Sequence, residues 1–211
     1  YRDRRQRQMC IRDRYYHFGI VDRMPTYRHK DTGKRFFFIH IPKTAGRFLQ
    51  ENFKLNGFEP EQLIWKHVDG IEIAHFHREL YQKHLNIKDI KHVTIVRDPL
   101  QRYLSLKTHN YPENENWLRP QVDYVTEETN IWKFEDRFDE KFSTWLSEVL
   151  EAHIKIKELD SDYTYNEKGQ KLFLEYKDPN YKKIESTDEI VNHVKSFYQE
   201  DYKLWYNSLN K

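Results

Sequence analysis

The sequence predicts a single-domain α/β protein with a central parallel β-sheet flanked by helices. Three short apolar runs, at residues 35–41, 90–96 and 131–135, are rich in aromatic and β-branched residues, as buried strands are. Segments with the apolar spacing of helices lie between these runs and after them. Strands that alternate with helices usually form a parallel sheet with crossover helices.

Each element has its own signal. The helix predicted at 46–56 ends at an Asn-Gly pair, and the helix at 99–109 has proline in its first turn, where proline is tolerated. Apolar periodicity predicts further helices at 77–86 and 136–155, and one or two helices at 186–209 after a Ser-Thr-Asp cap. Weaker strands are predicted at 61–65 and 68–76, a hairpin at 163–176, and a long polar connection at 109–130.

Charge separates a short leader from the rest of the chain. The protein has 36 Lys and Arg and 34 Asp and Glu, but the first fourteen residues alone hold six Arg and two Asp. The remainder therefore carries 30 basic and 32 acidic residues. We interpret residues 1–14 as a disordered or non-native basic leader and residues 15–211 as the domain. Nucleic-acid binding would depend on the leader alone, so no nucleic-acid partner is expected.

Composition also limits the setting of the protein. No apolar stretch approaches the roughly 20 residues that span a bilayer, and no secretory leader is evident. The single cysteine, Cys10, excludes an internal disulfide and a cysteine-only metal site. A reducing, cytoplasmic environment is the default expectation.

Cations follow two of the predicted strands. Pro42-Lys43-Thr44-Ala45-Gly46 comes after the first run, and Arg97-Asp98-Pro99 after the second. Ligands bind at the carboxyl ends of parallel strands, and helix N-termini favour anions, so a phosphate or sulfate site is predicted here. Gly46 would let the backbone approach the anion. The sequence G-x-x-x-x-G-K-[ST] occurs nowhere in the chain, which disfavours ordinary ATP or GTP hydrolysis.

These stretches resemble two motifs of sulfotransferases that use 3′-phosphoadenosine 5′-phosphosulfate (PAPS). "FFFIHIPKTAGRFLQ" is similar to their 5′-phosphosulfate loop, and "VTIVRDPLQRYLSL" to their 3′-phosphate motif. The carbohydrate sulfotransferases of the heparan 2-O and chondroitin type, with their bacterial relatives, are the most similar branch. Weaker similarity extends over most of residues 35–206. The resemblance implies a P-loop NTPase-like sulfotransferase fold, PAPS as donor, 3′-phosphoadenosine 5′-phosphate (PAP) as product, and no metal.

The resemblance also implies roles for the first motif. Lys43 would contact the oxygen between phosphorus and sulfur, where negative charge grows as the S–O bond breaks. Backbone amides and the Thr44 hydroxyl would hold the 5′-phosphate. The loop residues expected to bind the cofactor are Thr44, Ala45, Gly46, Arg47 and Phe48. Many relatives have Thr or Ser at the position of Arg47, whose guanidinium could serve the same phosphate or face an anionic acceptor.

The second motif would bind the 3′-phosphate that distinguishes PAPS from ATP. Arg97 and Ser105 are the expected ligands, and Arg102 would add charge. Arg97 and Ser105 are eight residues apart in the sequence, so they can converge only if the chain bends back at the start of the helix.

Transfer to a hydroxyl also requires a base, and His75 and His77 lie near a predicted strand end. Histidine suits this role because its unperturbed pKa lies near the working pH. His75 is favoured as the residue nearer the strand end, and Glu79 and Asp69 are weaker candidates. No group of side chains has a recognised metal-ligand spacing.

The expected acceptor is a hydroxyl of an oligo- or polysaccharide, with a small-molecule alcohol or tyrosine as alternatives. Tyr111, Trp117 and Tyr124 lie in the polar connection and could stack on a sugar or on adenine. A kinase-like phosphotransferase on a related fold is the rival reading, which would require a magnesium-binding carboxylate and ATP. We expect a soluble cytoplasmic enzyme of microbial or viral type, or a soluble domain without a Golgi anchor. The oligomeric state stays open.

Overall fold

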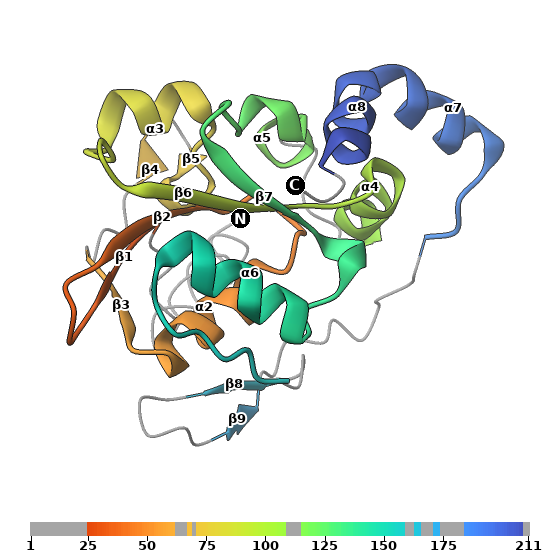
Figure 1. The fold of residues 1–211 in the computed structure, drawn as a ribbon. Coiled ribbons are helices and arrows are strands. Elements are labelled where there is room, and N and C mark those ends of the chain that lie inside the picture. The colour runs from red at the N-terminus through yellow and green to blue at the C-terminus, as the bar shows by residue number, and fades with distance from the viewer. Residues whose placement is uncertain are drawn as a thin grey trace, which may run out of the picture.

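The computed structural model describes residues 25–61, 67–68, 71–108, 115–158, 163–165, 171–173 and 184–208. Over these residues the chain forms a mixed five-stranded sheet in the order β3-β1-β2-β6-β7, flanked by helices (Figure 1). The strands are β1 (Thr26–His29), β2 (Arg35–Ile39), β3 (Phe58–Pro60), β6 (Lys91–Val96) and β7 (Thr129–Lys133). The predicted α/β class is confirmed at this level.

The three apolar runs form the neighbouring parallel strands β2, β6 and β7, as predicted. Phe38 of β2 is in register with Val93 of β6, and Thr94 of β6 with Ile131 of β7. Because parallel neighbours end at the same edge of a sheet, the residues that follow β2 and β6 meet at that edge.

The strands on one side of the sheet, β1 and β3, pair in antiparallel fashion, so the prediction of a parallel sheet is wrong for these two strands. A tight turn joins β1 to β2, and Gly33 in this turn has a φ of +68°. A connection this short can join only antiparallel strands. β3 pairs with β1 on its other side. Of the strand predicted at 61–65, only Glu61 lies within the described residues, directly after β3.

The predicted helices are present, although α6 is shorter than expected at both ends. They are α2 (Gly46–Leu55), α3 (Arg78–His84), α4 (Pro99–Thr108), α6 (Glu140–Leu150), α7 (Asp188–Phe197) and α8 (Gln199–Asn207). Thr187 caps α7 as predicted, because its hydroxyl oxygen accepts the N–H of Ile190 at 3.3 Å. A short helix α5 (Glu115–Leu118) and a 3₁₀ turn (Gln121–Asp123) lie within the predicted polar connection.

Two small antiparallel pairs complete the described strands. They are β4 (His67–Val68) with β5 (Ile71–Glu72), and β8 (Tyr163–Tyr165) with β9 (Lys171–Phe173). The segment predicted as one strand at 68–76 is therefore divided, and a 3₁₀ turn (Ile73–His75) follows β5. The hairpin strands are confirmed. The predicted leader at 1–14 lies outside the described residues, and every described helix is too short or too polar to cross a membrane.

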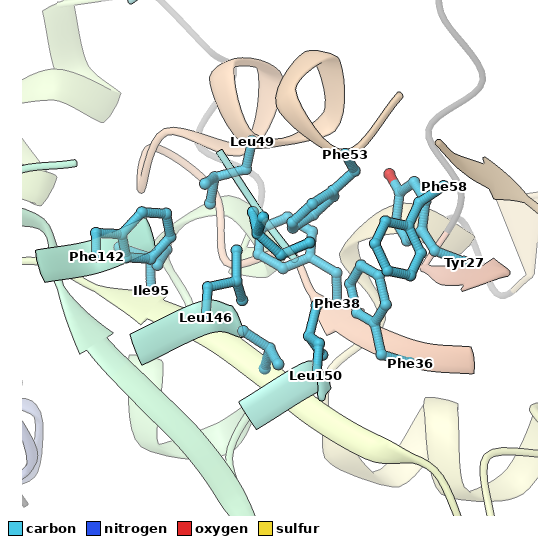
Figure 2. Packing of buried hydrophobic residues seen from close by; sticks show 12 residues of the cluster. Tyr27, Phe36, Phe38, Leu49, Phe53, Phe58, Ile95, Phe142, Leu146 and Leu150 are labelled. Carbon is cyan, nitrogen blue, oxygen red and sulfur yellow. The ribbon is translucent and has the colours of Figure 1, made fainter. Parts of the chain in front are cut away.

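Side chains of β2 alternate between two hydrophobic clusters. Phe36 and Phe38 pack against α2 and α6, as Figure 2 shows, and Phe37 and Ile39 face the opposite cluster. The first cluster includes Leu49, Phe53, Phe142 and Leu146. The second includes Leu80 and Tyr81 of α3 and is flanked by Leu204 and Trp205 of α8. Packing on both faces fixes β2, and with it the start of the loop that follows.

Candidate functional site

The loop between β2 and α2, residues 40–45, has an unusual backbone. Lys43 and Ala45 have φ values of 68° and 71°, in the left-handed region that residues other than glycine seldom adopt. Such conformations cluster at functional sites, where the surrounding structure holds them. Ala45 caps α2 without a side-chain hydrogen bond. The first N–H groups of α2 lack intrahelical partners and carry the positive end of the helix dipole, so they suit an anion.

Two arginines hold the carbonyl groups of this loop. Arg97, directly after β6, donates from Nη1 to the carbonyl oxygen of Lys43 at 3.2 Å. Arg102, on α4, donates from Nε to the carbonyl oxygen of Pro42 at 3.1 Å. In a planar trans peptide the carbonyl and the following N–H point in opposite directions. The N–H groups of Lys43 and Thr44 therefore point away from the two arginines.

The residues expected at the 3′-phosphate differ in exposure. Arg102 is 2% exposed, and its Nη2 atom also donates to the carbonyl oxygen of Trp117 at 3.1 Å. It is thus a buried cross-link between α4, the loop and α5. Ser105 lies one turn further along α4 and is half-buried. Arg97 is also half-buried, and its guanidinium carbon lies 4.4 Å from the centre of the Phe134 ring, in a 3₁₀ turn (Phe134–Asp136) after β7.

Lys43 is the residue whose charge the site perturbs most clearly. The pKa of its ammonium group is lowered to about 8. Burial is the main cause, and the positive charges of Arg47 and Arg97 add to it. Three cations therefore act on one another around the loop. A bound anion would relieve this repulsion and favour the protonated form of Lys43. The loop therefore has the electrostatic character of an anion site.

The other loop residues face different surroundings. Thr44 is fully buried, and its hydroxyl donates to the carbonyl oxygen of Ile41 at 2.8 Å. An anion would then meet the Thr44 backbone amide rather than the hydroxyl proton, which the loop itself uses. Arg47 is exposed in the first turn of α2. The ring of Phe48 packs against that of Phe138, with centroids 5.2 Å apart, so the Phe48 side chain lies against the first core cluster.

His75 lies directly against the loop. Its Nδ1 atom is 3.1 Å from the carbonyl oxygen of His40, and the two imidazole rings are 4.4 Å apart. Because a carbonyl oxygen can only accept, this hydrogen bond places the proton of the neutral ring on Nδ1 and leaves a lone pair on Nε2. The ring of Trp117 also contacts His75, with ring centroids 4.8 Å apart. The hydrogen bond gives His75 the tautomer that a base acting through Nε2 requires, while the residue is 6% exposed and its Nε2 atom is buried, so a substrate could reach that atom only if the side chains around it moved.

The side chain of His40 explains why residue 46 is a glycine. A Cβ atom on Gly46 would lie 1.7 Å from Nε2 of His40, a distance that no pair of non-bonded atoms tolerates. The His40 ring is 8% exposed and stacks on Phe38 with centroids 5.8 Å apart. Glycine therefore makes room for the imidazole, a steric role that supplements the expected close approach of an anion.

His77, the second candidate base, begins α3 as its cap residue and is 7% exposed. Burial is the main cause that lowers its pKa, and the positive charge of Arg119 lowers it further, while Glu79 and Asp123 oppose the change. The structure thus places His75 in a 3₁₀ turn that contacts the loop, and His77 at the start of the helix that follows.

The three aromatic residues proposed for stacking lie in different environments. Trp117 is half-buried and contacts His75, so it stands beside the loop. Tyr124 is 1% exposed in the second core cluster, which leaves almost no ring surface for a sugar or adenine. Burial raises the pKa of its phenol to about 12. Tyr111 lies outside the described residues.

Several residues of the site are absent from the sequence-based prediction. His40 shares a face of the β2 segment with Phe36 and Phe38, so strand periodicity could have identified it. Gln121 and Asp201 have no comparable signal. The side-chain amide of Gln121 bonds both backbone groups of Arg97, and the carboxylate of Asp201 holds the backbone of Gln121.

The loop, the β6 end and the 3₁₀ turn before α3 together place Lys43, Arg97 and His75 at one edge of the sheet. Lys43 and Arg97 place positive charge there, and His75, with its Nε2 atom buried, lies against the same loop. Comparisons of the chain with protein-family models, with curated proteins and with solved structures give no match.

Proposed function

We propose that the protein is a sulfotransferase that moves a sulfuryl group from PAPS to a hydroxyl, with a carbohydrate as the favoured acceptor. The observation that carries this proposal is the bond between Arg97 and the carbonyl oxygen of Lys43. It couples two cationic strand ends, each followed by a helix, into one anion site. A donor with anionic groups at both its 5′ and 3′ positions is suited to two such neighbouring sites.

The donor's 5′-phosphosulfate would lie at the N-terminus of α2, over the backbone amides from Thr44 to Phe48. The Lys43 ammonium would face the bridging oxygen. As the acceptor oxygen bonds to sulfur, the bond from sulfur to this oxygen breaks, and its electron pair stays on the 5′-phosphate of PAP. A cation fixed at that oxygen stabilises the charge that develops in the transition state.

The acceptor hydroxyl must lose its proton in the same reaction. We assign this proton to Nε2 of His75, because the bond to the His40 carbonyl oxygen keeps Nδ1 protonated. His75 then becomes an imidazolium beside an anionic product. Trp117 packs on the same imidazole, so an acceptor sugar that approaches His75 would meet an indole ring, a surface suited to stacking.

Calorimetry with PAP and with adenosine 5′-phosphate tests the proposal, since the two ligands differ only in the 3′-phosphate. We expect PAP to bind more tightly, and Lys43→Ala to abolish transfer of labelled sulfate from PAPS while the protein stays folded. Lys91→Ala is the matched control, because Lys91 is exposed at the start of β6, the end of this strand that is remote from Arg97. Equal binding of the two nucleotides would overturn the assignment, and tighter binding of magnesium-ATP would favour a kinase instead.

A further inference from the structure

The backbone of Arg97 is held by a side chain instead of a strand. The β6–β7 pairing ends with Val96 opposite Lys133, one residue before Arg97. There the Arg97 N–H donates to Oε1 of Gln121 at 3.0 Å, and Nε2 of Gln121 donates to the Arg97 carbonyl oxygen at 2.8 Å. A primary amide thus replaces the next strand residue in satisfying both backbone groups.

Gln121 is itself held by the C-terminal helix. The backbone N–H of Gln121 donates to Oδ2 of Asp201 at 2.8 Å, and the N–H of Val122 donates to Oδ1 at 3.0 Å. Gln121 and Asp201 are both fully buried. One carboxylate of α8 therefore caps the turn that carries Gln121. Hydrogen bonds that backbone N–H groups donate to a carboxylate are among the stronger ones in proteins.

We propose that Gln121 and Asp201 are positioning residues for the anion site. They act in series: Asp201 orients Gln121, Gln121 orients the backbone of Arg97, and Arg97 bonds the carbonyl oxygen of Lys43. This inference rests on the proposed function, because it assigns to α8 a part in binding the 3′-phosphate through Arg97. Neither residue touches the reacting atoms.

A purely structural role is the alternative, and the chain offers a control for it. Asn56, the C-cap of α2, makes the same two-bond clamp on a distant backbone: its Oδ1 accepts the Lys155 N–H at 2.8 Å, and its Nδ2 donates to the Lys155 carbonyl oxygen at 3.0 Å. This clamp lies at the end of α2 that is remote from the loop. Losing either clamp should lower thermal stability, but only the Gln121 clamp bears on Arg97.

The experiment compares dissociation constants for PAP and for adenosine 5′-phosphate by calorimetry, in the wild type and three variants. Gln121→Met keeps the side-chain length and removes both bonds. Asp201→Asn replaces one acceptor oxygen with an NH₂ group, which cannot accept a hydrogen bond from a backbone N–H. We expect each of these two variants to lower the affinity for PAP by about 10- to 100-fold, the range that loss of an orienting partner causes at metal sites. The affinity for adenosine 5′-phosphate should fall much less.

Asn56→Leu should lower the melting temperature and leave the preference for PAP unchanged. If Gln121→Met and Asp201→Asn also keep the wild-type preference, the two residues are structural only and the inference is overturned, while the proposed function stands. If the wild type itself does not prefer PAP, the proposed function fails and this inference with it. Should Gln121→Met not fold, Asp201→Asn decides between these outcomes.

Discussion

The Nη1 atom of Arg97 lies 3.2 Å from the carbonyl oxygen of Lys43, and this hydrogen bond joins the ends of two parallel strands. It also brings the Arg97 guanidinium close enough to Lys43 to lower the pKa of the ammonium group. The same contact therefore holds the loop backbone and places a second positive charge near Lys43. The charge on Lys43 opposes folding, and the first two predictions follow from its lowered pKa.

Lys43→Met should make the ligand-free protein more stable at pH 7. The pKa of Lys43 is about 8 in the folded protein and near 10.5 when unfolded, so the folded state holds this proton less tightly. The charged lysine therefore destabilises the fold fully below pH 8, and the cost fades as the pH rises toward 10.5. Each kcal/mol gained should raise the melting temperature by about 2–4 °C.

Thermal unfolding of both proteins at pH 7 and at pH 10.5 checks this prediction. The gain from Lys43→Met should be present at pH 7 and largely absent at pH 10.5. Lys91→Met, at the exposed start of β6, should change little at either pH. A lower melting temperature for Lys43→Met at pH 7 would show that its charge does not oppose folding.

Binding of PAP should weaken as the pH rises above about 8, where Lys43 loses its proton in the free protein. The anion binds the protonated lysine, so each further pH unit should lower the affinity by up to about tenfold. Lys43→Arg stays charged throughout this range and should remove most of the pH dependence. Calorimetry between pH 7 and 9.5 measures both slopes, and equal slopes would assign the titration to another group.

The sequence predicts the centre of the sheet better than its edge. β2 and β6 have continuous apolar runs because both of their faces are buried, and this pattern is easily recognised. β1 reads Thr-Tyr-Arg-His and β3 has three residues, so neither has a run long enough to show a period. Their antiparallel pairing depends on the turn at Gly33, which local pattern does not distinguish from an ordinary loop.

The sequence likewise predicts some residues of the candidate site and not others. Lys43 and Arg97 are predictable because each stands at a strand end, next to the start of a helix. Gln121 and Asp201 are not, because they are 80 residues apart in the sequence and meet only through tertiary packing. Tyr124 shows the reverse case, since an aromatic residue in a polar segment is as compatible with the core as with a binding surface.

Gly46→Ala should destabilise the protein, because its Cβ would lie 1.7 Å from Nε2 of His40. The His40 ring is packed against Phe38 and His75, so it can move only by disturbing them. Overpacking of this kind typically costs about 1–3 kcal/mol. His40→Ala should restore much of this loss in the double variant, since it removes the clashing ring.

Chemical denaturation of the wild type, the two single variants and the double variant gives the coupling free energy between the two positions. We expect this coupling to be favourable and at least about 0.5 kcal/mol, as for residues in direct contact. Additive effects would mean that a bulkier residue at 46 is opposed by something other than His40.

His75→Ala should lower kcat for sulfate transfer by about 10²- to 10⁴-fold with little change in PAP binding, the range expected for loss of a general base. His77→Ala should have a smaller effect, because His77 begins α3 whereas His75 contacts the loop through His40. Transfer of labelled sulfate from PAPS to the best acceptor in a polysaccharide screen provides the rate, and calorimetry with PAP provides the binding control. A large loss of kcat in His77→Ala beside near-normal activity in His75→Ala would move the base to His77. The His75–His40 hydrogen bond would then serve to support the loop, together with the contact between His75 and Trp117.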